Sequence, residues 1–166
     1  MNPNSEFEVG EKVTELDKAW LAGIIDGEGS IFVMKQKRKD RERDTNYILR
    51  VSVQSTDPFM AHECRNLAGG PVIYEQHEKR PNMSNTLKWE LNGRKAANFL
   101  ESILPYMRVK HAQAKLALEF QRTTKKHWKH MIPADYANQA RLYQELKQAK
   151  MDLKLGKTGL FGSPGA

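Results

Sequence analysis

Cysteine is almost absent from this chain, because Cys64 is the single one among 166 residues. A disulfide framework within the chain and a cysteine-rich zinc site are therefore excluded. No apolar run reaches the ~20 residues that a transmembrane helix needs. Residues 1–12 are acidic and lack both the apolar core of a signal peptide and the arginine-rich pattern of a transit peptide. We therefore expect neither a membrane span nor an obvious targeting signal.

The charge, in contrast, is strongly one-sided. Lys and Arg number 27 against 20 Asp and Glu, which gives a formal net charge of +7. A surplus of this size indicates a polyanionic partner, most often a nucleic acid. From the charge alone, a basic protein without such a partner is equally open.

Helical and strand patterns alternate along the chain. Residues 14–17, Thr-Glu-Leu-Asp, have the spacing of a capping box, with Asp in place of the usual Glu, and predict a helix start. Gly27 and Gly29 are expected to end that helix. We expect helix 16–26, strands 30–35 and 47–54, helix 58–67, strands 71–76 and 86–92, a helix from 93 that ends before Pro105, and helices 109–122 and 134–153. Residues 14–155 form one domain in this reading, between a disordered segment 1–13 and a flexible tail 156–166.

This order of elements indicates an α+β fold with one antiparallel sheet and helices on one of its faces. In strand 47–54, the odd positions from Tyr47 to Val53 suit a buried face, and the even positions are polar except Ile48. The free face then carries Arg50, Ser52 and Gln54, and on the first strand Ser30, Gln36 and Arg38. Phe32 and Met34 share that parity and leave the first strand less certain. An exposed, twisted, polar sheet face suits the major groove of DNA.

Residues 21–29, Leu-Ala-Gly-Ile-Ile-Asp-Gly-Glu-Gly, contain choices that do not favour folding. Gly23 and Gly27 each weaken a helix by about 1 kcal/mol relative to alanine. Glu28 falls at the C-terminal end of the expected helix, where the helix dipole repels negative charge. Residues 26–29 alone would read as an ordinary acidic turn, but the residues before them and the strands after them favour a functional reason.

This segment resembles the signature of the LAGLIDADG homing endonucleases at seven of nine positions, counting Glu28 as a conservative change. The order of elements resembles the αββαββα fold of that family, and residues 104–110 with Gln113 and Ala114 resemble the segment that supplies its catalytic lysine. The resemblance covers roughly residues 14–122 and includes one copy of the signature. It implies a twisted antiparallel sheet that forms a DNA-binding saddle, and a homodimer that cleaves both strands of a long pseudo-palindromic target.

The resemblance also implies roles for particular residues. Glu28, with the backbone carbonyl of Gly27, is expected to bind Mg²⁺, and Lys110 is expected near the scissile phosphate. The polar residue that many relatives add at the end of the second strand is Gln54 by residue type, or Ser55 by its distance from the next helix. At the dimer interface we expect Trp20 and the small residues Ala22 and Gly23, with Asp26 capping or orienting the partner helix.

The expected DNA contacts lie on the two hairpins. They are Ser30, Phe32, Met34, Gln36, Arg38, Arg41, Ile48, Arg50, Ser52, Tyr74, Gln76 and Lys88. The alternative function is a non-cleaving relative, either a maturase that binds intron RNA or a DNA-binding regulator. Glu28 and Lys110 together favour the nuclease, because a binder needs no carboxylate at position 28. The compartment stays undetermined, since organelles, bacteria and phages all carry such genes.

Overall fold

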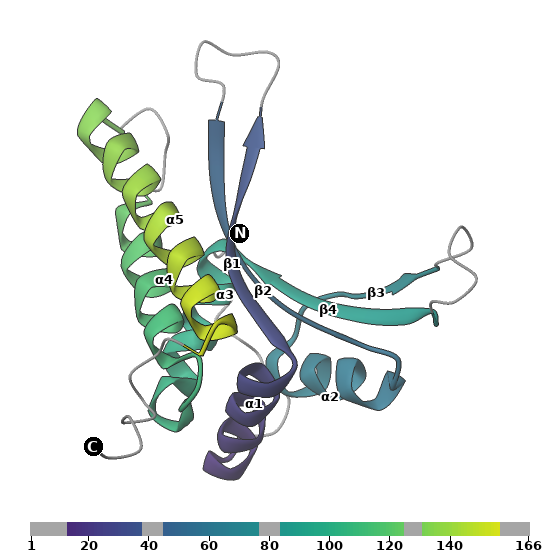
Figure 1. Cartoon of the computed structure of the whole chain (residues 1–166). Helices are drawn as coiled ribbons and strands as arrows, with labels where there is room; N and C mark the ends of the chain where they lie inside the picture. The colour runs from purple at the N-terminus through teal and green to yellow at the C-terminus, as the bar shows by residue number, and fades with distance from the viewer. Residues whose placement is uncertain (1–12, 38–44, 77–83, 125–130, 157–166) are drawn as a thin grey trace, which may run out of the picture.

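The structure is a computed structural model that describes residues 13–37, 45–76, 84–124 and 131–156. Its elements are α1 (Glu15–Gly27), β1 (Gly29–Lys37), β2 (Thr45–Ser55), α2 (Pro58–Ala68), β3 (Val72–Glu75), β4 (Thr86–Asn92), α3 (Gly93–Ile103), a 3₁₀ turn η1 (Leu104–Tyr106), α4 (His111–Thr123) and α5 (Pro133–Lys154). Figure 1 labels the α-helices and the strands. Each helix and strand predicted from the sequence is present, and the ends differ by at most two residues. The predicted loose ends lie outside the described residues, apart from Val13 and Gly156.

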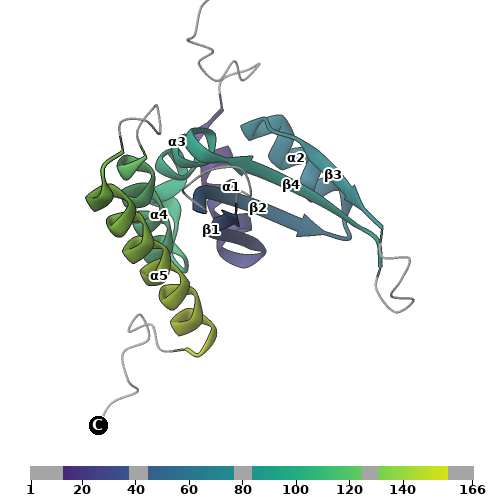
Figure 2. The same cartoon turned by 90° about the horizontal axis from the view of Figure 1, so that it is seen from above.

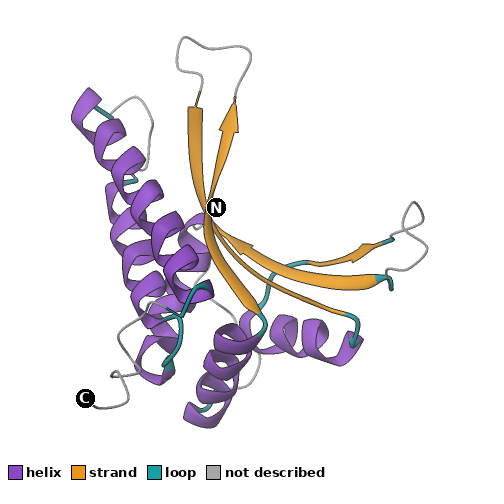
Figure 3. Cartoon of the chain, viewed as in Figure 1, coloured by secondary structure: helices purple, strands orange, loops and turns teal. Residues whose placement is uncertain are grey.

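The four strands form one antiparallel sheet in the order β1-β2-β4-β3. The two hairpins diverge, so the sheet is strongly curved (Figure 1). The helices gather behind its convex side, and no described helix crosses the concave side (Figure 3). The α+β class with helices on one face is therefore confirmed. No helix within the described residues is both long and apolar enough to span a membrane.

Alternation along the strands explains which face the helices cover. In β1, Ile31 and Val33 are buried, whereas Phe32 and Met34 are only half-buried. Leu49, Val51 and Val53 of β2 are fully buried, as their odd positions predicted. Since opposed residues on neighbouring strands share a face, the register Phe32↔Arg50 settles the parity of β1. Its even positions belong to the concave face, and its odd positions to the core.

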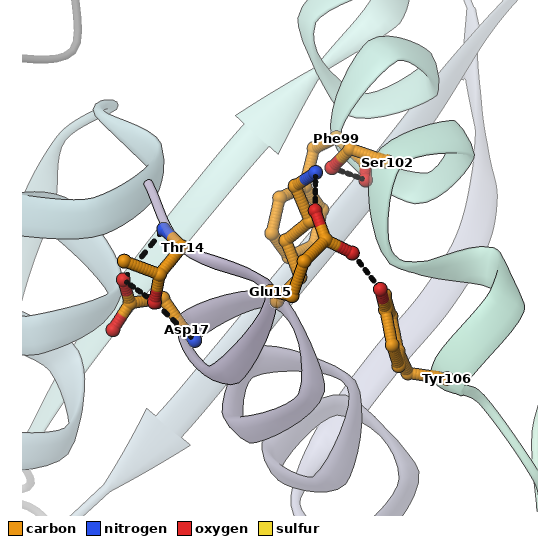
Figure 4. A network of polar contacts seen from close by, with 7 residues as sticks. Thr14, Glu15, Asp17, Phe99, Ser102 and Tyr106 are labelled. Atoms are coloured by element: carbon orange, nitrogen blue, oxygen red, sulfur yellow. Dashed lines mark hydrogen bonds and ion pairs between the residues drawn. The ribbon is translucent and has the colours of Figure 1, made fainter. Parts of the chain in front are cut away.

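The start of α1 is capped by its own side chains and linked to η1. Thr14 and Asp17 form the predicted capping box: the Asp17 backbone N–H donates to the Thr14 hydroxyl, and the Thr14 N–H donates to the Asp17 carboxylate (Figure 4). This hydrogen bonding lowers the pKa of Asp17. The Tyr106 hydroxyl donates to the Glu15 carboxylate, as Figure 4 also shows. These contacts define where α1 begins and join its first turn to η1.

Helix α5 packs along α4 and reaches the edge strand β1 (Figure 2). Tyr47 of β2 lies against the rings of Phe120 on α4 and Tyr143 on α5, with centroid distances of 6.5 and 5.4 Å. Further along α5, the Lys150 ammonium lies 5.7 Å from the ring centroid of Phe32. The C-terminal half of α5 therefore brings a lysine beside the concave face at β1.

Candidate active site and nucleic-acid interface

The Asp26 carboxylate, at the end of α1, binds the backbone that leads into α4. Its Oδ2 accepts hydrogen bonds from the N–H groups of Arg108 and Val109 at 2.7 and 3.1 Å, and Oδ1 accepts one from the Lys110 N–H at 2.8 Å. Amide donors before a helix lack intrahelical partners, so a carboxylate there satisfies several at once. Asp26 therefore has the structural role predicted from the sequence. Its hydrogen bonds go to the backbone before α4 of its own chain, and the expectation that it caps or orients the partner helix stays a prediction.

The Lys110 side chain binds the backbone of the junction between α1 and β1. Its Nζ donates to the backbone carbonyls of Ile25 and Gly29, at 2.8 and 2.7 Å. An ammonium group has three N–H donors, so one remains for another acceptor. Burial lowers the pKa of the Lys110 ammonium from its ordinary value; Asp26 raises it, Lys150 lowers it and Glu28 raises it, in decreasing order of effect. Lys110 is thus a held, half-buried cation next to the α1–β1 junction.

Glu28 occupies that junction as the C-cap residue of α1, and it is exposed. Its backbone N–H donates to the Ile24 carbonyl at 2.8 Å, which fixes the backbone and leaves the side chain outside the helix. Gly29, which follows, is required sterically, because a Cβ there would lie 2.7 Å from the Cα of Ile25. The tight turn therefore holds an exposed carboxylate whose charge raises the pKa of Lys110.

The outer side of α1 is open. A Cβ at Gly23 or Gly27 would meet no atom of the chain within 4 Å. Leu16, four residues before Trp20 and on the same stripe as both glycines, is 82% exposed. Ala22 is fully buried in the chain's own core, which corrects its assignment to the dimer interface. It lies one residue from the outer stripe, on the side of Leu21 and Ile25.

The concave face carries most of the predicted DNA-contact residues. The register aligns Ser30, Phe32, Met34 and Gln36 of β1 with Ser52, Arg50, Ile48 and Asn46 of β2, and Gln54 of β2 with Lys88 of β4. Arg38 and Arg41 lie outside the described residues. Ser52 is on this face but only 8% exposed, because Ser30 and Glu90 flank it.

Tyr74 lies on the other face of the sheet. It pairs with Leu87, whereas Ile73 pairs with Lys88, so β3 presents Ile73 and Glu75 to the concave side. The Tyr74 hydroxyl accepts a hydrogen bond from Asn85 at 2.8 Å. Gln76 lies just beyond β3 and is exposed. The prediction for Tyr74 failed because β3 is four residues long and its apolar run gave no parity.

Gln54 is turned away from β1. Its Nε2 donates to Thr86 Oγ1 at 2.8 Å and to Glu75 Oε2 at 2.9 Å, both on the β4–β3 side of β2. The Ser55 hydroxyl accepts the backbone N–H of Asp57 at 3.0 Å. These contacts link neither side chain to Glu28 or Lys110. We therefore assign no catalytic step to Gln54.

The sequence reading missed several residues of the concave face, among them the polar residues Glu75, Glu90 and Asn92. Glu90 Oε2 lies 3.1 Å from Lys88 Nζ and 3.5 Å from Arg50 Nη1, and Asn92 Oδ1 accepts from Arg50 Nε at 2.8 Å. The signal was present in residues 86–92, Thr-Leu-Lys-Trp-Glu-Leu-Asn, where polar and apolar residues alternate strictly. That alternation identifies the polar face of β4 without any structure.

Comparison with known proteins adds a relative and a set of similar folds. The DNA endonuclease I-CvuI of Chlorella vulgaris is 30% identical over 109 residues, which is 63% of this chain and 63% of that protein. A crystal structure of I-CvuI with its target matches with a TM-score of 0.69 and 25% identity, over 81% of this chain and 82% of that one. No protein-family model matches.

The chain has the fold of the LAGLIDADG homing endonucleases. The LAGLIDADG homing endonuclease I-SmaMI bound to cleaved DNA matches with a TM-score of 0.64 and 16% identity, over 90% of this chain and 49% of that one. The archaeal intron-encoded homing endonuclease I-Vdi141I with DNA matches at 0.67 and 19%, over 81% and 84%. The LAGLIDADG resemblance read from residues 21–29 is thereby confirmed.

Proposed function

We propose that this chain is one half of a homodimeric, site-specific DNA endonuclease that depends on a divalent metal ion. The observation that carries the proposal is the α1–β1 junction, where the Lys110 ammonium is anchored on the carbonyls of Ile25 and of Gly29, which directly follows the exposed Glu28 in the chain, and the Glu28 charge acts on it. The relation to I-CvuI supports the same reaction class, because structures of that endonuclease contain its DNA target. A duplex would lie on the concave face, which no described helix covers.

The dimer follows from the open side of α1. Two glycines on one exposed helix stripe let a second helix approach closely, and a symmetric contact places the same stripe on both partners. The chain's own packing gives no reason for glycine at positions 23 and 27, since open space surrounds both. A second copy crossing there would bring two Glu28 carboxylates together at the centre of a pseudo-palindromic target.

The residues at that centre suit Mg²⁺. No described group of three or more His, Cys, Asp or Glu residues is arranged to hold a metal within one chain. Mg²⁺ prefers one or two carboxylates completed by waters and phosphate oxygens, so an exposed Glu28 with the Gly27 carbonyl is a fitting donor set. Such an ion supplies activation of a water and stabilisation of the leaving oxygen in phosphodiester hydrolysis.

Lys110 would act on the scissile phosphate, and Asp26 would hold Lys110 in position. The free N–H donor and the positive charge of Lys110 would stabilise the charge that develops on the scissile phosphate. Its two carbonyl contacts hold the ammonium in place before the substrate arrives. Asp26 positions it indirectly, because its carboxylate fixes the backbone of Lys110.

The test is the isosteric change Glu28→Gln. We expect cleavage of a duplex selected by the wild-type protein from a randomised library to fall at least about 100-fold, as losses of this size follow removal of catalytic groups. Binding of that duplex should remain, because the concave face is unchanged. Glu63→Gln on α2 is the matched control and should cleave normally. Wild-type cleavage by Glu28→Gln would refute the proposed site, and binding without cleavage by the wild-type protein would favour the non-cleaving regulator. Nothing in the described residues or in the relatives points to intron RNA.

A further inference from the structure

Glu90 is an unexpected residue for a face that binds DNA. It lies on the concave side of β4, opposite Ser52, and its side chain is only 9% exposed. A carboxylate is costly to bury and repels phosphate, so its presence calls for partners. Its neighbours are cationic: Lys88 Nζ at 3.1 Å and Arg50 Nη1 at 3.5 Å from Oε2. Oε2 is buried, yet it accepts no hydrogen bond of good geometry.

Arg50 is held at two points by this arrangement. Its Nε donates to Asn92 Oδ1 at 2.8 Å, from the residue directly opposite on β4. Its Nη1 faces Glu90. Within the described residues no acceptor is found for Nη2. The guanidinium is therefore held through Nε and Nη1, on two sides of its plane, and the other hydrogen of Nη1 and both hydrogens of Nη2 stay as donors for an outside ligand, with 21% of the side chain exposed.

We propose that Arg50 reads one guanine in each half of the target, and that Glu90 and Asn92 are positioning residues for this contact. A guanidinium fork donates to O6 and N7 of guanine at once, which is the commonest specific contact in the major groove. Fixing the plane in advance removes the rotamer freedom that would otherwise be lost on binding. This inference rests on the proposed function, and it adds the base that one residue selects.

Lys88 does not compete for this role. It also ion-pairs with Glu75, at 3.4 Å, so two carboxylates surround its ammonium. An ammonium is a point charge without a planar fork and discriminates bases less sharply. On the described part of the concave face, Arg50 thus combines a fixed plane with unused donors.

The experiment selects bound duplexes from a randomised library and compares base preferences at each position. All variants carry Glu28→Gln, so that binding is measured without cleavage. Relative to that background, Arg50→Gln should abolish a guanine preference at one position of each half-site. Glu90→Gln and Asn92→Ala should reduce that preference about tenfold and leave the other positions unchanged. Arg50→Lys should not restore it, although the charge returns.

Glu101→Gln is the matched control, because Glu101 is exposed on α3 and its change alters the net charge by the same amount. The inference is wrong if no guanine preference depends on Arg50, or if Glu101→Gln weakens it as much as Glu90→Gln. If circular dichroism shows that Glu90→Gln does not fold, Asn92→Ala tests the same positioning role, because Asn92 is exposed. A background protein that binds no duplex, while the wild-type protein also fails to bind or cleave, would refute the proposed function itself.

Discussion

The two sides of helix α1 differ in how closely the rest of the chain packs against them. On the inner side, Asp26 accepts three backbone hydrogen bonds, and Gly29 fits against Ile25 with no room for a Cβ. On the outer side, Gly23 and Gly27 face open space. Residues on the inner side are explained by the fold of one chain. We propose that those on the outer side serve a second copy and the substrate, in which case folding and function separate across a single helix.

The largest effect should come from Asp26→Asn on the inner side. The amide is neutral and accepts at one terminal atom only, so all three backbone donors lose a charged partner and at least one loses its acceptor altogether. We expect the free energy of unfolding to fall by about 3 kcal/mol, since hydrogen bonds to charged groups contribute about 1.5–3 kcal/mol each. Urea denaturation measures it, with Asp152→Asn on α5 as the control. Equal losses in both variants would show that the Asp26 contacts are not specific.

The next test compares alanine at three glycines of the same segment. Gly29→Ala should destabilise the chain by about 1–3 kcal/mol, because its Cβ collides with the Ile25 backbone. Gly23→Ala should stabilise the isolated chain by up to about 1 kcal/mol through helix propensity. The same change, and Gly27→Ala with it, should weaken association in sedimentation equilibrium. Stronger association of both variants would contradict close helix crossing at this stripe.

The smallest effect concerns the pKa of Lys110. Burial lowers this pKa below the ordinary lysine value of 10.5, whereas Asp26 raises it and Lys150 lowers it. The ¹³Cε shift of Lys110 should therefore titrate at lower pH than that of the exposed Lys115. Lys150→Gln should move the midpoint up, and Asp26→Asn should move it down. Because unfolding restores the ordinary value, Lys110 costs stability below its folded pKa, and this cost disappears as pH rises toward 10.5.

A Lys110 midpoint equal to that of Lys115 would show that the junction is more hydrated than its contacts indicate. A Lys110 midpoint that does not change in Lys150→Gln would show that Lys150 on α5 has no electrostatic effect on the site. Either result would leave the Glu28→Gln experiment intact, since that test depends on the carboxylate alone.

Much of the molecule follows from local patterns. The capping box at Thr14, the proline at the start of α2 and the alternation of β2 predicted their elements to within two residues, because such signals act over a few neighbours. The signature at residues 21–29 carried the resemblance to the family, and with it the predicted roles of Glu28 and Lys110. These residues are 82 positions apart, and their proximity came from the resemblance and not from the pattern.

Tertiary structure alone decided the remaining points. Ala22 faces the core and Gly23 does not, because a helix turns about 100° per residue and packing selects which side is inward. Ile73, and not Tyr74, lies on the concave face, because the register with β4 sets the parity of a short strand. Likewise, Glu90 meets Arg50 across 40 residues of sequence through strand pairing, which no local signal encodes. Local patterns thus specified the elements and carried the signature, whereas strand pairing and helix packing brought particular side chains into contact.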